Sequence, residues 1–132
     1  MGLLDGRRIL VVEDETMIAM LLQDTLCNAG AVVLGPSYTV ADALTLLDTI
    51  KPDAAVLDLN LVGRPAGPVA DALGAKGVPF LVVTGYWKES GIPGHPNIPL
   101  IAKPFDPTEL VAVMAGLFTG REPVGPSPAG DG

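Results

Sequence analysis

The sequence predicts an α/β doubly wound domain, and two observations support this fold class. Five short apolar runs are continuous rather than alternating, which is typical of strands buried on both faces of a parallel sheet. Segments whose apolar residues recur at helical spacing lie between most of these runs, as they do in strand–helix–strand units. The runs are residues 9–12, 31–34, 54–57, 80–83 and 100–102.

Helical spacing of apolar residues predicts four helices. The first has apolar residues at positions 18, 21, 22 and 26 and is expected to end near Gly30. The second has them at positions 40, 43, 44 and 47, with Ser37 or Thr39 as its N-cap. A third spans residues 69–76, and the last begins at Pro107, a residue type suited to the first turn of a helix.

The connection between the fourth and fifth runs differs from the others. Residues 86–99 contain two glycines and three prolines, which predicts a short or irregular fourth helix, or a loop in its place. The segment 120–132 is rich in Pro and Gly and is expected to be a disordered tail. We therefore expect one domain over residues 1–119.

Composition narrows the class of protein. The chain has 132 residues, 48% of them hydrophobic and only 5% aromatic, so it can form one mainly aliphatic core. The net charge of -7 argues against binding to nucleic acid or to anionic lipid surfaces. No run approaches the ~20 apolar residues that span a bilayer, and residues 1–8 lack the apolar segment of a signal peptide. Together with a single cysteine, Cys27, which we expect in the core, this favours a cytoplasmic location.

Polar residues follow four of the apolar runs. Five parallel strands suit the flavodoxin-like order 2-1-3-4-5, in which strands 1 and 3 are neighbours and ligands bind beyond the carboxyl ends of the strands. Because those ends lie at one edge of the sheet, we expect the polar side chains to converge there. They are Glu13 and Asp14 after the first run, Asp58 after the third, Thr84 after the fourth and Lys103 after the fifth.

The chemistry of this set points to phosphoryl transfer. Three carboxylates at one edge repel one another, and a hard cation such as Mg²⁺, which binds carboxylate oxygens and waters, would offset their charge. Asp58 could then act as a nucleophile toward a phosphoryl group. Lys103 would balance the charge of that group, and the Thr84 hydroxyl would hydrogen-bond another of its oxygens.

Four motifs occur in the same order and at the same spacing as in response-regulator receiver domains, and the chain resembles that family over about residues 8–118. The motifs are ILVVEDE at 9–15, VLDLNL at 56–61, VTG at 83–85 and KPF at 103–105. The resemblance also implies that the Lys103–Pro104 peptide bond is cis. It implies the following roles: Mg²⁺ ligands Glu13, Asp14, Asp58 and Asn60 (backbone carbonyl), phosphoacceptor Asp58, and phosphoryl contacts Thr84 and Lys103.

The chain departs from the usual receiver pattern in two places, one of which is the short, Pro- and Gly-rich connection between Thr84 and Lys103. The other is a missing aromatic residue. Receivers usually carry Tyr or Phe three residues before the lysine, where it acts as a rotamer switch, and this chain has Leu100. Tyr86 and Trp87 are either loop anchors or replacements for that aromatic residue. The chain is also similar to a group of bacterial single-domain receivers with a Phe-Ala-Thr-Gly motif, although Val82 and Val83 stand in place of the Phe and Ala.

The resemblance implies a function in signalling rather than an enzyme. We expect a single-domain response regulator of a two-component phosphorelay, which accepts a phosphoryl group from a histidine kinase or phosphotransfer protein. Its output would be a contact with an unknown downstream protein, or a phosphate sink. One alternative is a receiver-like scaffold that acts without phosphorylation. Another is an aspartate-nucleophile phosphatase, which is disfavoured because Asn60 stands where such enzymes have an acidic proton donor.

Overall fold

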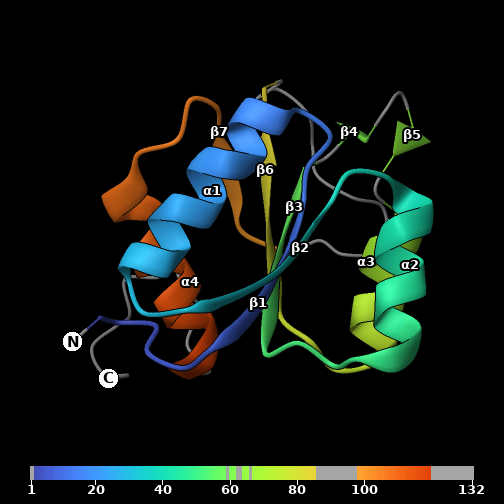
Figure 1. The fold of residues 1–132 in the computed structure, drawn as a ribbon, viewed down its shortest axis with the longest axis horizontal. Helices are drawn as coiled ribbons and strands as arrows, with labels where there is room; N and C mark the ends of the chain where they lie inside the picture. The colour runs from blue at the N-terminus through green and yellow to red at the C-terminus, as the bar shows by residue number, and fades with distance from the viewer. Residues whose placement is uncertain (1, 59, 62–63, 66, 86–97, 120–132) are drawn as a thin grey trace.

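Parallel pairing of five strands organises the described part of the chain. The computed structural model describes residues 2–58, 60–61, 64–65, 67–85 and 98–119. The sheet has the order β2-β1-β3-β6-β7, and each neighbouring pair is parallel (Figure 1). Counted along the chain within this sheet, the order is 2-1-3-4-5, as the sequence predicted. The strands are β1 Arg8–Val12, β2 Val32–Ser37, β3 Ala54–Asp58, β6 Phe80–Thr84 and β7 Leu100–Ala102.

Helices cover both faces of this sheet. Helices α1 and α4 lie on one face and α2 and α3 on the other (Figure 1). Alternate residues of the strands pack on opposite sides, so that Leu10 faces the core beneath α2 and α3 while Ile9 and Val11 face the core beneath α1 and α4. This two-sided burial is why the strands read as continuous apolar runs. The helices are α1 Thr16–Asn28, α2 Val40–Thr49, α3 Gly67–Ala75 and α4 Pro107–Thr119.

Local signals account for the helix ends. The Thr39 side chain accepts a hydrogen bond from the Asp42 N–H at 3.0 Å, which makes Thr39 rather than Ser37 the N-cap of α2. Helix α1 ends two residues before Gly30, whose φ of +97° suits glycine. These features confirm the predicted end of the first helix and the predicted start of the second.

Strand β2 pairs irregularly with β1 near its carboxyl end, at the edge of the sheet where ligands were predicted to bind. It extends to Ser37, three residues beyond the predicted run, and its register against β1 shifts between Leu10 and Val12. Gly35 has a φ of +90°, and a Cβ there would lie 2.7 Å from the Ser37 backbone nitrogen. After this bend, the Ser37 carbonyl accepts a hydrogen bond from the Glu13 N–H at 3.0 Å. The bend therefore anchors the backbone just after β1.

One assignment on α1 needs correction, and one core residue was missed. Cys27 is exposed rather than buried in the core. Met17 and Met20 on the same helix are 78% and 55% exposed. The buried face of α1 is formed by Ala19, Leu22 and Leu26, which places the intervening residues toward solvent. Leu4, which precedes the first strand, is fully buried.

Two short strands follow β3 outside the main sheet. After β3, strands β4 Asn60–Leu61 and β5 Arg64–Pro65 form a small antiparallel pair. The predictions for the fourth connection fall on residues 86–97, which include Tyr86 and Trp87 and lie outside the described residues, as does the predicted tail at 120–132. Among the helices that are described, none combines the length and apolar character needed to cross a membrane.

Candidate metal centre

Neighbouring strand ends bring the predicted polar residues to one edge of the sheet. Glu13 directly follows β1, Asp58 is the last residue of β3, and Thr84 is the last residue of β6. Lys103 follows β7, and its N–H donates a hydrogen bond to the Thr84 carbonyl at 2.8 Å. Because β1 and β6 both pair with β3, these residues surround the end of the central strand.

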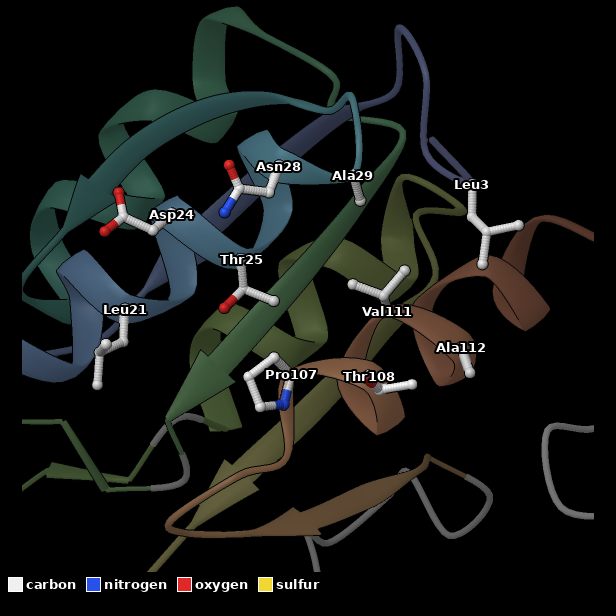
Figure 2. Close-up of a pocket in the computed structure, with 10 residues that line it drawn as sticks. All are labelled: Leu3, Leu21, Asp24, Thr25, Asn28, Ala29, Pro107, Thr108, Val111 and Ala112. Carbon is white, nitrogen blue, oxygen red and sulfur yellow. The ribbon is translucent and has the colours of Figure 1, made fainter. Parts of the chain in front are cut away.

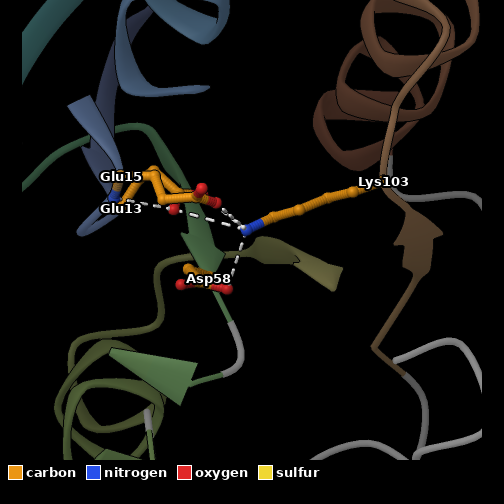
Figure 3. Close-up of polar contacts among 4 residues, drawn as sticks. All are labelled: Glu13, Glu15, Asp58 and Lys103. Atoms are coloured by element: carbon orange, nitrogen blue, oxygen red, sulfur yellow. Dashed lines mark hydrogen bonds and ion pairs between the residues drawn. The ribbon is translucent and has the colours of Figure 1, made fainter. Parts of the chain in front are cut away.

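The Lys103 ammonium group is shared among carboxylates. Its Nζ lies 3.1 Å from Glu13 Oε1, 3.2 Å from Asp58 Oδ1 and 3.7 Å from Glu15 Oε1. It also donates a hydrogen bond to Glu13 Oε2 at 3.3 Å. Figure 3 shows the lysine side chain reaching across from β7 to the three acidic residues. The structure therefore places lysine and acids in one pocket, as expected from the strand order.

Three carboxylates in this pocket are close enough to share a cation. Glu13, Asp14 and Asp58 each offer an oxygen, and these oxygens lie within 4.8 Å of one another. Glu13 Oε1 is buried and has no hydrogen-bond partner, although it is near the lysine charge. One ammonium group cannot neutralise three ionised carboxylates. An all-oxygen donor set with surplus negative charge fits a hard divalent cation.

Burial and crowding shift the proton affinities of these groups. Burial raises the pKa of Glu13 to about 7, despite the hydrogen bond from the Glu15 N–H. Burial also raises the pKa of Asp58, and the neighbouring Asp14 carboxyl raises it further, while Lys103 opposes both effects. For Lys103, burial lowers the pKa, but Glu13 and Asp58 outweigh it, so the pKa is raised overall. Without a cation, burial therefore makes Glu13 and Asp58 easier to protonate than they are in water, while Lys103 keeps its charge.

Thr84 and Asn60 were also predicted as site residues. Thr84 is 1% exposed and lies at the correct strand end, next to Lys103 in the backbone hydrogen-bond pattern. Asn60 begins β4, two residues beyond Asp58, and its part as a carbonyl ligand stays a prediction. The Lys103–Pro104 peptide bond is cis, as the resemblance implied. Leu100 is 38% exposed on β7.

Sequence reasoning assigned no role to Glu15, which the structure brings into the pocket. It is the third acid of the run 13–15, and its position at the start of α1 was the available signal. Its N–H donates a hydrogen bond to Glu13 Oε2 at 3.1 Å. Both its backbone and its side chain thus contact the site.

A separate hollow lies between α1 and α4 and has a volume of about 450 Å³ (Figure 2). Leu3, Leu21 and Val111 contribute apolar surface to it, and Asp24 lies at its side. None of the residues of the acidic pocket lines this hollow. The two features are therefore distinct parts of the surface.

Comparisons with known proteins agree with the geometry. No protein-family model matches the chain. The chain is 34% identical over 112 residues to the phyllosphere-induced regulator PhyR of Methylorubrum extorquens, with 81% of this chain and 42% of PhyR aligned. The chain spans about half the length of the curated relatives it matches.

Two solved structures are covered almost completely by the chain. The solution structure of SdrG from Sphingomonas melonis Fr1 matches with a TM-score of 0.75 and 38% identity, covering 89% of this chain and 99% of SdrG. The receiver (REC) domain of the PhyR response regulator from Erythrobacter litoralis matches with a TM-score of 0.74 and 28% identity, covering 86% of this chain and 92% of that domain. The likeness therefore extends over at least 92% of each of these two molecules.

Proposed function

Because this chain belongs to the response-regulator receiver domains of two-component signalling, we propose that it accepts a phosphoryl group on Asp58 and signals through the resulting change. Receiver domains are in general signalling domains rather than enzymes. The observation that carries the proposal is the Lys103 ammonium group, 3.2 Å from Asp58 Oδ1 and beside two further carboxylates. This arrangement offers a nucleophile, a counter-charge and a cation site within one pocket.

Glu13, Asp14 and Asp58 would hold Mg²⁺, with the Asn60 carbonyl as a further ligand. When bound, Mg²⁺ would supply positive charge close to the acceptor and to a phosphoryl oxygen. These residues fit it because their oxygens lie within 4.8 Å of one another, while the lysine alone leaves negative charge uncompensated.

The protein's own groups would then perform the transfer. An Asp58 carboxylate oxygen attacks phosphorus, and a new O–P bond forms as the bond from phosphorus to the donor breaks. The donor keeps the electron pair of the broken bond. Lys103 donates hydrogen bonds to a phosphoryl oxygen, and the Thr84 hydroxyl donates to another, so that the transferred charge is stabilised from two strands.

The donor and the output belong to the same proposal. A histidine kinase or phosphotransfer protein in the cytoplasm donates the phosphoryl group, and a downstream protein binds the modified form. Phosphorylation adds about -1.5 to -2 of charge at the carboxyl ends of the strands. That charge draws Lys103 and Thr84 toward the phosphoryl oxygens and shifts the population toward the conformation in which they make these contacts.

Mass spectrometry after incubation with acetyl phosphate and Mg²⁺ tests the proposal. We expect one added phosphoryl group on the wild type and on Asp48→Asn, a control on the exposed face of α2, and none on Asp58→Asn. Modification that persists in Asp58→Asn would reject Asp58 as the acceptor. An unmodified wild type that also fails to bind Mg²⁺ would favour a scaffold, and rapid hydrolysis of a generic phosphate ester would favour a phosphatase.

A further inference from the structure

Glu15 occupies a helix N-cap without using its side chain as a cap. Its backbone is extended, with φ -87° and ψ 116°. The side chains that usually cap a helix N-terminus are the shorter ones of Ser, Thr, Asp and Asn. The Glu15 side chain makes no capping hydrogen bond. Its Oε1 lies 3.7 Å from Lys103 Nζ instead, and Figure 3 shows it directed toward the ammonium group. The carboxylate of this N-cap residue is therefore directed toward the lysine and not toward the helix N–H groups.

Glu15 lies on the solvent side of the lysine. Its side chain is 65% exposed, whereas that of Lys103 is 14% exposed and that of Glu13 is fully buried. Glu15 is also outside the group of carboxylates that could share a cation, which comprises Glu13, Asp14 and Asp58. When a cation binds Glu13 and Asp58, Glu15 is the acidic contact of Lys103 that does not also bind the cation.

We propose that Glu15 is a positioning residue that restrains Lys103 at the mouth of the pocket and competes with the incoming phosphoryl group for its ammonium. The inference rests on the proposed function, because it concerns the rate at which Asp58 is modified. Lys103 must turn its charge toward the phosphoryl oxygens, and a carboxylate on its solvent side opposes that movement. The same carboxylate repels an anionic donor that arrives from solution.

The size of the effect follows from the exposure of the pair. Partly exposed ion pairs contribute about 0.2–1 kcal/mol, which corresponds to a change of roughly 1.4- to 5-fold in a rate or affinity. We therefore expect Glu15→Gln to accelerate phosphorylation of Asp58 by acetyl phosphate, at saturating Mg²⁺, by about two- to fivefold.

Two further variants distinguish the effect of the Glu15–Lys103 contact from the effect of removing one negative charge from the protein surface. Asp24→Asn removes one exposed charge from the same helix, outside the acidic pocket, and is expected to leave the rate within experimental error of the wild type. Glu15→Asp keeps the charge but shortens the side chain by one methylene, so its rate is expected to lie between those of the wild type and Glu15→Gln. A rate for Glu15→Asp equal to that of the wild type would overturn the restraint by contact.

Binding of beryllofluoride, an analogue of the phosphoryl group, provides a readout that does not depend on turnover. In the presence of Mg²⁺, its affinity measured by fluorine NMR should rise about two- to fivefold in Glu15→Gln and not in Asp24→Asn. Equal rates and equal affinities in the wild type and Glu15→Gln would overturn the inference while leaving the proposed function intact. A wild type that is never modified at Asp58 would overturn both.

Discussion

The Lys103 ammonium group lies 3.2 Å from Asp58 Oδ1, although the two residues are 45 positions apart in the sequence. The backbone of Lys103 is held by its hydrogen bond to the Thr84 carbonyl, which continues the pairing of β7 with β6. Since β6 also pairs with β3, the sheet itself sets the distance between the lysine and the acceptor. The stability of the protein and its affinity for Mg²⁺ should therefore both depend on Lys103 and on the residues that position the acidic side chains.

Removal of the lysine should destabilise the metal-free protein. Lys103→Met leaves Glu13 and Asp58 without their nearby positive charge, and an unpaired buried polar group costs about 1–3 kcal/mol. We expect a loss of this order in the free energy of unfolding by urea at about pH 8, and a smaller loss when Mg²⁺ is added. The exposed Lys51→Met serves as a control. Equal stabilities of Lys103→Met and wild type without metal would contradict the prediction.

The stability of the metal-free protein should decrease with pH across the titration of Glu13. Burial raises the pKa of Glu13 from 4.5 to about 7, so between these values the folded state binds a proton that the unfolded state has released. This contribution, up to about 3 kcal/mol, is complete below pH 4.5 and is lost as the pH rises to about 7. Asp58 acts in the same direction.

Urea unfolding in the presence of a chelator checks this pH dependence. Glu13→Gln cannot titrate, so its free energy of unfolding should decline less over the same interval. Mg²⁺ binds the ionised carboxylates, and its stabilising effect on the wild type should therefore grow as the pH rises. Parallel pH profiles for wild type and Glu13→Gln would show that Glu13 does not titrate as described.

The bend in β2 should be sensitive to a single methyl group. Gly35 has a φ of +90°, and a Cβ would lie 2.7 Å from the Ser37 nitrogen and 3.2 Å from the Val11 carbonyl oxygen. We expect Gly35→Ala to lower the free energy of unfolding by at least about 1–2 kcal/mol. It should also weaken Mg²⁺ binding, because the displaced Ser37 carbonyl holds the Glu13 N–H.

A matched glycine provides the control for this bend. Gly67, at the start of α3, has open space where a Cβ would be placed, so Gly67→Ala should leave both properties nearly unchanged. Thermal unfolding and calorimetric titration with Mg²⁺ measure the two effects. A fully stable Gly35→Ala with normal Mg²⁺ affinity would refute the role given to the bend.

The segment before β1 should contribute to the core. Leu4 is fully buried among residues beneath α1 and α4, and its N–H donates a hydrogen bond to the Ala29 carbonyl at 2.9 Å. Leu4→Ala should cost about 2–5 kcal/mol of unfolding free energy. Leu3 is 70% exposed, and Leu3→Ala should change stability by less than about 0.5 kcal/mol. Similar unfolding curves for the two variants would argue against core packing by Leu4.

Periodicity predicted the strands well where burial is complete. The strand β3, whose five residues are all buried, could be recognised from its apolar run alone. Residues on α1 were harder to place, because apolar side chains such as Met17 and Leu21 also occur on its exposed face. Leu4 was missed because it is an isolated buried residue outside any periodic element.

The order of polar residues along the chain was sufficient to predict a shared edge, since the carboxyl ends of parallel strands meet there. Glu13, Asp58 and Lys103 could therefore be grouped before any coordinates were considered. Only the tertiary structure decided which carboxylates contact the ammonium group, that Glu15 is among them, and that the bend at Gly35 anchors Glu13. The physical reason is that the strands and helices follow from local patterns of burial, whereas contacts of a few ångströms depend on side-chain direction and on register shifts between distant segments.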